Sequence, residues 1–162
     1  MMAMRILVVS DSHGSNAELI QAMDKMEKPD IILHLGDNIE DGEEISKIFG
    51  IETHIVRGNG DYDHNYPYDK LVKIAGKNIF MTHGHRWNVK MGFMSLYYKG
   101  LELGADLILY GHTHLPINTE EKGISIMNPG SPSLPRQRDK VKTLGLIEIK
   151  ENQVKTKIIK LP

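Results

Sequence analysis

The sequence predicts an α+β protein in which two mixed β-sheets pack against each other with helices on the outside. Apolar, β-branched runs alternate with helical patterns over the first two-thirds of the chain, and strand patterns outnumber helical ones. The strand patterns also mix continuous apolar runs, typical of buried parallel strands, with hairpins. The 162 residues have the length of one domain, so we expect residues 1–162 to fold as a single domain.

Three strands and two helices are expected in the first third of the chain. The strands are nearly continuous apolar runs over residues 4–10, 31–35 and 53–56. Residues 15–18 (Ser-Asn-Ala-Glu) have the form of a capping box, and apolar residues then recur at helical spacing. A second, shorter helix is expected to begin near residues 41–42. Strands separated by helices in this way are typical of parallel pairing.

The pattern shifts toward hairpins in the rest of the chain. Residues 70–75 and 78–82 flank Gly76-Lys77, which is suited to a hairpin turn. Residues 91–103 have helical spacing. Four further strand patterns follow, over residues 106–110, 123–127, 143–150 and 153–160. The last two surround Glu151-Asn152, a second hairpin turn.

Composition excludes several classes of protein. There are 20 Lys and Arg against 21 Asp and Glu, so nothing in the charge favours a long nucleic acid or a membrane surface as partner. The absence of cysteine excludes a disulfide scaffold, a Cys-ligated zinc site and a thiol nucleophile. The longest apolar runs have four residues, far fewer than the roughly 20 that span a bilayer. We therefore expect a cytoplasmic protein without a signal peptide, with the oligomeric state left open.

Metal-ligating side chains follow five of the predicted strands. In α/β sheets, sites form in the loops beyond the carboxyl ends of strands, so these side chains are expected to meet. The candidates are Asp11, His13, Asp37, Asn59, His83, His112 and His114. Each motif alone also fits a helix cap, a turn or a surface histidine. All five in this order favour a shared site.

The candidate ligands carry oxygen and imidazole groups, which suit Mn²⁺, Fe²⁺, Ni²⁺, Co²⁺ or Zn²⁺. Seven ligands are too many for one catalytic ion that keeps an open position. Two ions about 3.5–4 Å apart that share a carboxylate fit the number better, and such a pair supports hydrolysis of phosphate esters. His34 and His54 lie within strands, where a buried, hydrogen-bonded role is expected instead.

The ordered motifs resemble those of the calcineurin-like metallophosphoesterases over residues 5–134. The Gly-Asn-Gly-Asp motif at 58–61, Thr-His-Gly-His at 82–85 and Asn-Pro-Gly-Ser at 128–131 are most similar to its small bacterial and archaeal phosphodiesterases. The resemblance implies a four-layer αββα sandwich with a dinuclear site at one edge. It implies that one ion is held by Asp11, His13, Asp37 and His114, and the other by Asp37, Asn59, His83 and His112. Asp37 would bridge the two ions, with Mn²⁺ the expected metal.

The function implied is a metal-dependent phosphodiesterase in which a metal-bound hydroxide attacks a small phosphodiester. The alternative is a non-catalytic scaffold on the same fold, as in the retromer-subunit branch, which has lost site histidines. The presence of every expected ligand here favours catalysis.

One residue departs from the pattern of larger family members. They have a histidine that assists the leaving oxygen where this chain has Gly60. His85 is the nearest replacement as general acid, and the other interpretation is that it only supports the neighbouring ligands.

Other residues keep two interpretations each. Asn38 either contacts a phosphoryl oxygen or stabilises a turn, and Asp41 either orients a ligand histidine or caps the next helix. Ser131 is expected to support the site rather than to act as nucleophile. Arg136 and Arg138 either meet substrate phosphates or lie in a solvated loop. Four aromatic residues either line a base pocket or oligomer contact, or pack in the core: Trp87, Phe93, Tyr97 and Tyr98.

Overall fold

The computed structural model describes residues 3–162, and in this part of the chain ten strands form two five-stranded sheets. The first sheet has the order β10-β9-β1-β2-β3. Its strands are β1 (Met4–Val9), β2 (Ile31–His34), β3 (Glu52–Ile55), β9 (Thr143–Lys150) and β10 (Gln153–Lys160). The first three strands run parallel, and β9 and β10 add an antiparallel hairpin next to β1.

The second sheet has the order β4-β5-β6-β8-β7. Its strands are β4 (Asp69–Ile74), β5 (Lys77–Thr82), β6 (Leu107–Leu109), β7 (Ile117–Glu121) and β8 (Ile124–Asn128). Strands β5, β6 and β8 are parallel, and the antiparallel β4 and β7 form the two edges. The mixed pairing predicted from the sequence is confirmed.

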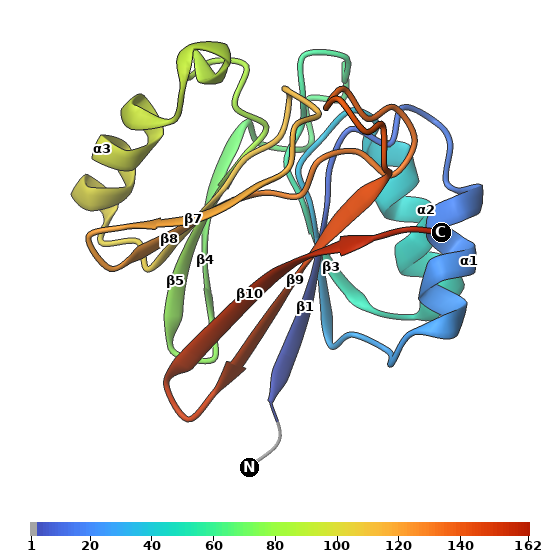
Figure 1. Cartoon of the computed structure of the whole chain (residues 1–162), viewed down its shortest axis with the longest axis horizontal. Helices are drawn as coiled ribbons and strands as arrows, with labels where there is room; N and C mark the ends of the chain where they lie inside the picture. Colours follow the sequence, from blue (N-terminus) through green and yellow to red (C-terminus); the bar gives the residue numbers. More distant parts are fainter. Residues whose placement is uncertain (1–2) are drawn as a thin grey trace.

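Helices cover the outer faces of both sheets, which makes the fold a four-layer αββα sandwich (Figure 1). Helices α1 (Ala17–Lys25) and α2 (Ile39–Phe49) lie on the first sheet, and α3 (Met94–Leu103) lies on the second, preceded by a 3₁₀ turn, η1 (Val89–Met91). Three apolar clusters fill the spaces between the layers. The cluster between the sheets includes Ile6, Leu33 and Met81. None of the helices in the described residues is long and apolar enough to cross a membrane.

The start of α1 differs from the prediction. Asn16 is the N-cap residue, and the capping box expected at residues 15–18 does not form, because no side chain caps the helix. The Asn16 amide donates instead to the Asp41 carbonyl oxygen and to the Glu44 carboxylate on α2. A tertiary contact between the two helices has therefore replaced the local cap. Helix α2 begins at Ile39, slightly earlier than expected.

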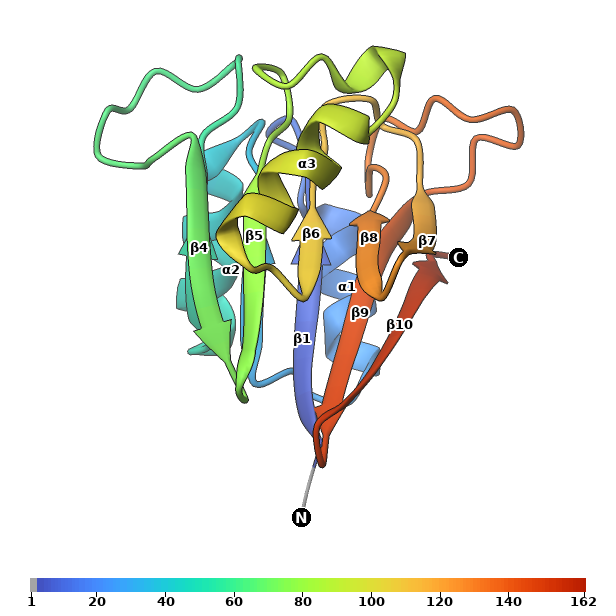
Figure 2. The same ribbon diagram turned by 90° about the vertical axis from the view of Figure 1, so that its left-hand side faces the viewer.

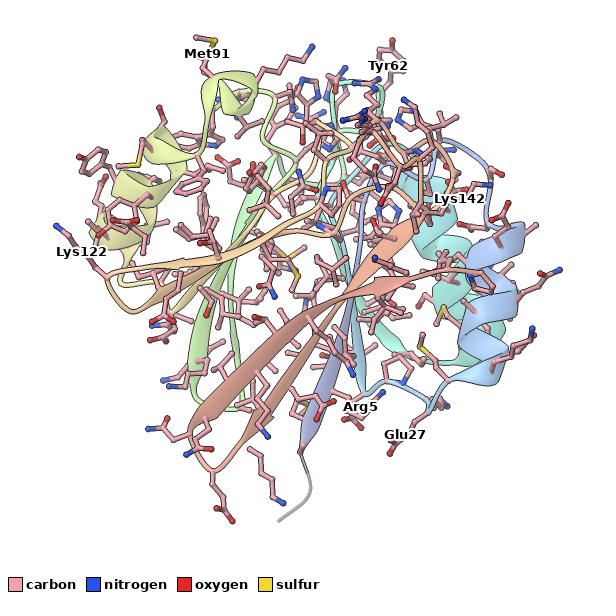
Figure 3. The ribbon with its side chains drawn as sticks, viewed as in Figure 1. Arg5, Glu27, Tyr62, Met91, Lys122 and Lys142 are labelled. Atoms are coloured by element: carbon pink, nitrogen blue, oxygen red, sulfur yellow. The ribbon has the colours of Figure 1, made fainter. Side chains whose placement is uncertain are left out.

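The topology brings the carboxyl ends of the parallel strands to one end of the molecule. Figure 2 shows the long loops after β3, β5, β6 and β8 gathered at this end. Figure 3 shows Tyr62, from the loop after β3, and Met91, from η1, projecting outward there, and their side chains are 85% and 82% exposed. We call this end of the molecule the loop end.

Candidate metal centre

The predicted ligands all follow strands at the loop end. Asp11 and His13 come after β1, Asp37 after β2, Asn59 after β3, His83 after β5, and His112 and His114 after β6. Backbone hydrogen bonds join neighbouring loops within each sheet. The Asp11 N–H donates to the Gly36 carbonyl, the His13 N–H to the Asp37 carbonyl, and the Gly111 N–H to the His83 carbonyl.

One group of ligand atoms consists of Asp11, His13 and His114, whose facing atoms lie within 4.8 Å of one another. The Nε2 atoms of the two histidines are 3.1 Å apart. Asp11 Oδ1 lies 3.7 Å from the Nε2 of His13 and 3.3 Å from that of His114. Asp11 and His114 are buried, whereas a third of the His13 side chain is exposed.

A second group consists of Asp11, Asp37 and His83, again within 4.8 Å. His83 Nε2 lies 3.4 Å from Asp37 Oδ2, 3.7 Å from Asp11 Oδ1 and 3.1 Å from Asn59 Oδ1. Asp37 Oδ2 is also 3.9 Å from His13 Nε2 in the first group. Asp37 therefore belongs to the second group and also lies close to His13 of the first, whereas Asp11 belongs to both groups.

The hydrogen bonds of two histidines determine which of their nitrogens face the centre. His83 Nδ1 is 2.8 Å from the Leu35 carbonyl oxygen, and His114 Nδ1 is 2.6 Å from that of Leu134. A carbonyl can only accept, so each Nδ1 carries the proton and donates it. In the neutral rings, Nε2 then presents a lone pair to the centre. Histidines that bind metals are commonly oriented by such contacts.

The centre therefore fits divalent cations. Carboxylate oxygens and imidazole lone pairs face one another, and Asp11 Oδ1 is buried without a hydrogen-bond partner in the described chain. Facing acceptors repel one another unless a proton or cation lies between them. Two groups that share one carboxylate, that of Asp11, are the arrangement expected of a pair of ions.

The ionisation of these groups reflects the same clustering. Burial alone would raise the pKa of Asp11, but the contacts with His114 and His13 outweigh it and hold that pKa well below its usual range. The contact with Asp11 raises the pKa of His13. Burial lowers the pKa of His83, but the carboxylates of Asp37 and Asp11 outweigh it, so the net shift is upward. The carboxylates thus favour positive charge at the centre, which metal ions also supply.

His112 and His85 lie beside these groups rather than inside them. The His112 backbone N–H donates to Asp11 Oδ2, and its ring centroid is 5.2 Å from that of His83. Burial, followed by the charge of His83, lowers the pKa of His112 to about 4. The ring of His85 is 5.5 Å from that of His83 and 6.2 Å from that of His112, and its buried Nδ1 has no partner in the described chain.

Asp61 is a supporting residue that the sequence analysis missed. Its buried carboxylate accepts three backbone N–H groups, from Asp37 at 2.9 Å, Ile39 at 3.0 Å and Gly58 at 2.8 Å. It thereby fixes the loop after β2 against the loop after β3. The acidic residue that ends the Gly-Asn-Gly-Asp motif was its only signal in the sequence, since Asp side chains often accept from nearby backbone in loops.

Two glycines let the backbone approach the carboxylates closely. A Cβ atom at Gly58 would lie 2.1 Å from Asp37 Oδ1, and one at Gly111 would lie 2.0 Å from Ser10 Oγ and 2.8 Å from Asp11 Oδ2. Gly60 N–H donates to Asp37 Oδ1 at 2.9 Å.

The structure shows the roles of several residues for which the sequence allowed two interpretations. Asn38 is the N-cap of α2, and its carbonyl accepts from the Asp41 N–H, which favours the turn role. The Asp41 carboxylate accepts from the Gly14 N–H instead of contacting a ligand histidine, and the N-cap of α2 is Asn38, so neither alternative role of Asp41 is found. Ser131 Oγ donates to the Asp11 carbonyl and supports the site as expected. His34 is buried and hydrogen-bonded, as predicted. Its Nε2 faces Ser12 Oγ, and its Nδ1 accepts from the Gly36 N–H.

A groove of about 560 Å³ adjoins the centre on the side of α3. Thr113, which lies between His112 and His114, forms part of its wall, and Tyr110 and Leu115 also line it. Lys90 and Arg136 add two cations to the lining. Arg136 and Arg138 are both exposed, but only Arg136 is among the residues that line this groove.

The four aromatic residues divide between the groove, the core and the surface. Phe93 lines the groove. Tyr97 is buried, and Trp87 packs edge-on against Phe80. Tyr98 is 63% exposed. The core interpretation therefore holds for Tyr97 and Trp87.

Known proteins share both the sequence pattern and the fold. A probable metallophosphoesterase of Bacillus subtilis, YsnB, is 34% identical over 137 residues, which cover 83% of this chain and 79% of that protein. The crystal structure of a predicted phosphoesterase from Streptococcus pneumoniae has 30% identity and a TM-score of 0.81, and the match covers 99% of this chain and 91% of that one.

A further likeness shows the fold alone. Vps29 from Entamoeba histolytica, complexed with Zn²⁺, has a TM-score of 0.79 but 21% identity, and the match covers 97% of this chain and 99% of that one.

The domain family described as the calcineurin-like phosphoesterase superfamily matches residues 4–152. With that match and the relatives above, the chain belongs to the calcineurin-like phosphoesterase superfamily.

Proposed function

We propose that this protein is a phosphodiesterase that uses two divalent metal ions, with Mn²⁺ as the expected ion. The observation that carries the proposal is the pair of Asp/His groups that share Asp11, with Asp37 Oδ2 of one group 3.9 Å from His13 Nε2 of the other. When bound, two such ions supply Lewis acidity that activates water and neutralises charge on a phosphoryl group. Asp11, His13 and His114 would hold one ion, and Asp37, His83, Asn59 and His112 the other, with Asp37 shared.

The protein's own residues prepare this site before substrate arrives. The carbonyls of Leu35 and Leu134 hold two histidine rings with Nε2 inward. Asp61 and Ser131 fix the backbone of Asp37 and Asp11. Groups held in this way need little reorganisation during the reaction, which is a main source of electrostatic catalysis.

The groove beside Thr113 supports a diester rather than a monoester as substrate. A diester carries a second organic group that must lie outside the metal centre. The groove volume of about 560 Å³ is within the range of small-molecule sites, and its lining is largely apolar. Lys90 and Arg136 at the groove also favour an anionic substrate.

His85 is our candidate for protonation of the leaving oxygen. Its ring lies beside those of His83 and His112, at the edge of the metal centre. Its Nδ1 is buried, so Nε2 is the atom available to a substrate. General acid catalysis typically contributes about 10²–10⁴-fold to the rate.

The test is hydrolysis of bis(p-nitrophenyl) phosphate and p-nitrophenyl phosphate by purified protein loaded with Mn²⁺, Ni²⁺, Fe²⁺, Co²⁺ or Zn²⁺. We expect metal-dependent turnover, with the diester preferred by kcat/KM. A preference for the monoester would refute the diester assignment. Metal-loaded, folded protein that hydrolyses neither compound, nor other phosphate esters, would favour the scaffold alternative.

A further inference from the structure

Two arginine side chains contact one aromatic ring near the metal centre. Tyr68 lies just before β4, Arg57 lies shortly after β3, and Arg86 follows β5. The guanidinium carbon of Arg57 is 3.9 Å from the centroid of the Tyr68 ring, and that of Arg86 is 4.6 Å from it. We call these three residues the arginine cluster. Cation–π contacts of this kind hold a guanidinium in place while leaving its N–H groups free to donate.

The arginine cluster has no counter-ion within the described chain. None of the ion pairs found in residues 3–162 involves Arg57 or Arg86. The Nη1 atom of Arg57 is 2.7 Å from His64 Nδ1, and the buried Nε of Arg57 has no hydrogen-bond partner there. Two cations on one ring repel each other, so an anion bound close to both would lower the electrostatic energy.

The arginine cluster adjoins the metal centre through His85. The Tyr68 ring is 5.3 Å from the ring of His85, which is in turn 5.5 Å from the ring of His83. Both loops that carry the arginines lie at the loop end, as Figure 2 shows. The His85 ring thus lies between the cluster and the buried Asp/His groups, so a phosphoryl group held by the metal ions and an anion held by the arginines would occupy neighbouring positions.

We propose that Arg57, Arg86 and Tyr68 form an anion-binding subsite for a second phosphate group, carried by the substrate in addition to the scissile diester. The inference rests on the proposed function, because it takes the substrate to be a phosphodiester. The planar guanidinium forms paired hydrogen bonds to phosphate oxygens, which a single ammonium cannot do. The metal ions would neutralise the scissile group, so the arginines are available for the additional charge.

Calorimetry on metal-loaded protein tests the subsite without turnover. The probes are adenosine 5′-monophosphate and adenosine 3′,5′-bisphosphate, which differ by one phosphate. We expect the bisphosphate to bind the unmodified protein more tightly by about tenfold, the effect of one charge-assisted contact. In Arg57→Met and Arg86→Met this advantage should shrink to less than about threefold, while binding of the monophosphate stays within about twofold.

Two further variants separate the subsite from general electrostatics. Arg138→Met removes the same charge from an exposed position at the loop end and should keep the tenfold advantage. Arg57→Lys keeps the charge but loses the planar fork, and should keep only part of it. Thermal unfolding of each variant confirms that it is folded.

The results distinguish the subsite from its alternatives. Equal weakening of both probes in Arg57→Met and Arg86→Met would place the arginines at the scissile phosphate and overturn the proposal. An undiminished preference for the bisphosphate would also overturn it. Hydrolysis of bis(p-nitrophenyl) phosphate, which lacks the second phosphate, should be unchanged in both variants. If no diester is hydrolysed but the arginine-dependent preference is found, the phosphodiesterase proposal fails while the anion subsite stands.

Discussion

Replacement of Asp61 by alanine should weaken both the fold and the metal centre. The substitution leaves three backbone N–H groups, of Asp37, Ile39 and Gly58, without their acceptor. Each buried donor left unpaired costs about 1–3 kcal/mol. Because water can enter the space and satisfy part of this loss, we expect a total of about 3–5 kcal/mol, at the upper end of single substitutions. For a chain of this length, that lowers Tm by roughly 6–20 °C.

The assay compares Asp61→Ala and Asp61→Asn with Asp63→Ala by thermal unfolding and by titration with Mn²⁺. Asparagine keeps one acceptor oxygen, so its loss should be smaller, about 1–3 kcal/mol. Asp63 lies in the same loop but accepts a single exposed N–H, from Asn65, so its replacement should change stability by less than about 0.5 kcal/mol. Metal affinity should fall about 10–100-fold in Asp61→Ala, as for other residues that support ligands. If Asp61→Ala unfolds at the same temperature as Asp63→Ala, the role given to Asp61 is wrong.

Four further predictions test the metal centre. Asp37→Ala should reduce activity to background and Asn59→Ala should reduce it by about 10–100-fold, because the proposed bridging carboxylate contacts histidines of both groups and the amide only one. Equal metal content and equal rates in the two variants would refute the bridging role. His85→Ala should slow the hydrolysis of an alkyl diester by up to about 10²–10⁴-fold and that of a nitrophenyl diester much less, while the metal content stays unchanged. Equal slowing of the two reactions would argue against His85 as the proton donor. Gly111→Ala brings a Cβ to 2.0 Å from Ser10 Oγ and should cost about 1–3 kcal/mol in urea unfolding, so an unchanged midpoint would show that the loop yields freely. Chelation by EDTA should lower Tm, since the ions bind the folded state, and superimposable melting curves would contradict a resident metal pair.

Regular elements with strong hydrophobic patterns could be predicted from the sequence. Strands β9 and β10 have the bounds expected from their apolar patterns and from the Glu151-Asn152 turn. Strand β7 was missed because residues 117–121 form an exposed edge with few apolar positions. Such a strand is specified by its partner β8 rather than by its own composition.

The ligand-bearing loops could be predicted, but their supporting contacts could not. A polar residue after a buried strand is visible in the sequence, and the sheet topology brings such residues together. The contact between His114 Nδ1 and the Leu134 carbonyl depends on how a loop 20 residues later returns to the site. The arginine cluster is similar, because Arg57, Tyr68 and Arg86 belong to no motif and meet only when the loops after β3 and β5 are folded.

The backbone conformation of the ligand residues, and not only their place at the edge of the sheets, shapes the metal centre. Five of the seven predicted ligands have left-handed backbone: φ is 60° at Asp11, 50° at His13, 46° at Asp37, 71° at His112 and 60° at His114. This conformation is uncommon outside glycine, although Asp and His adopt it more readily than most residues, and sparsely populated conformations cost of order 1–3 kcal/mol each. Regular strand geometry already sends residues two apart to the same face of a sheet. The left-handed residues instead turn the backbone at the end of the strand, and Asp11 and His13 direct their ligand atoms to one group from this turned backbone. The hydrogen bonds that Asp61 accepts, that Ser131 donates and that form between the loop backbones offset this strain. The fold thus holds acceptors together where cations can bind.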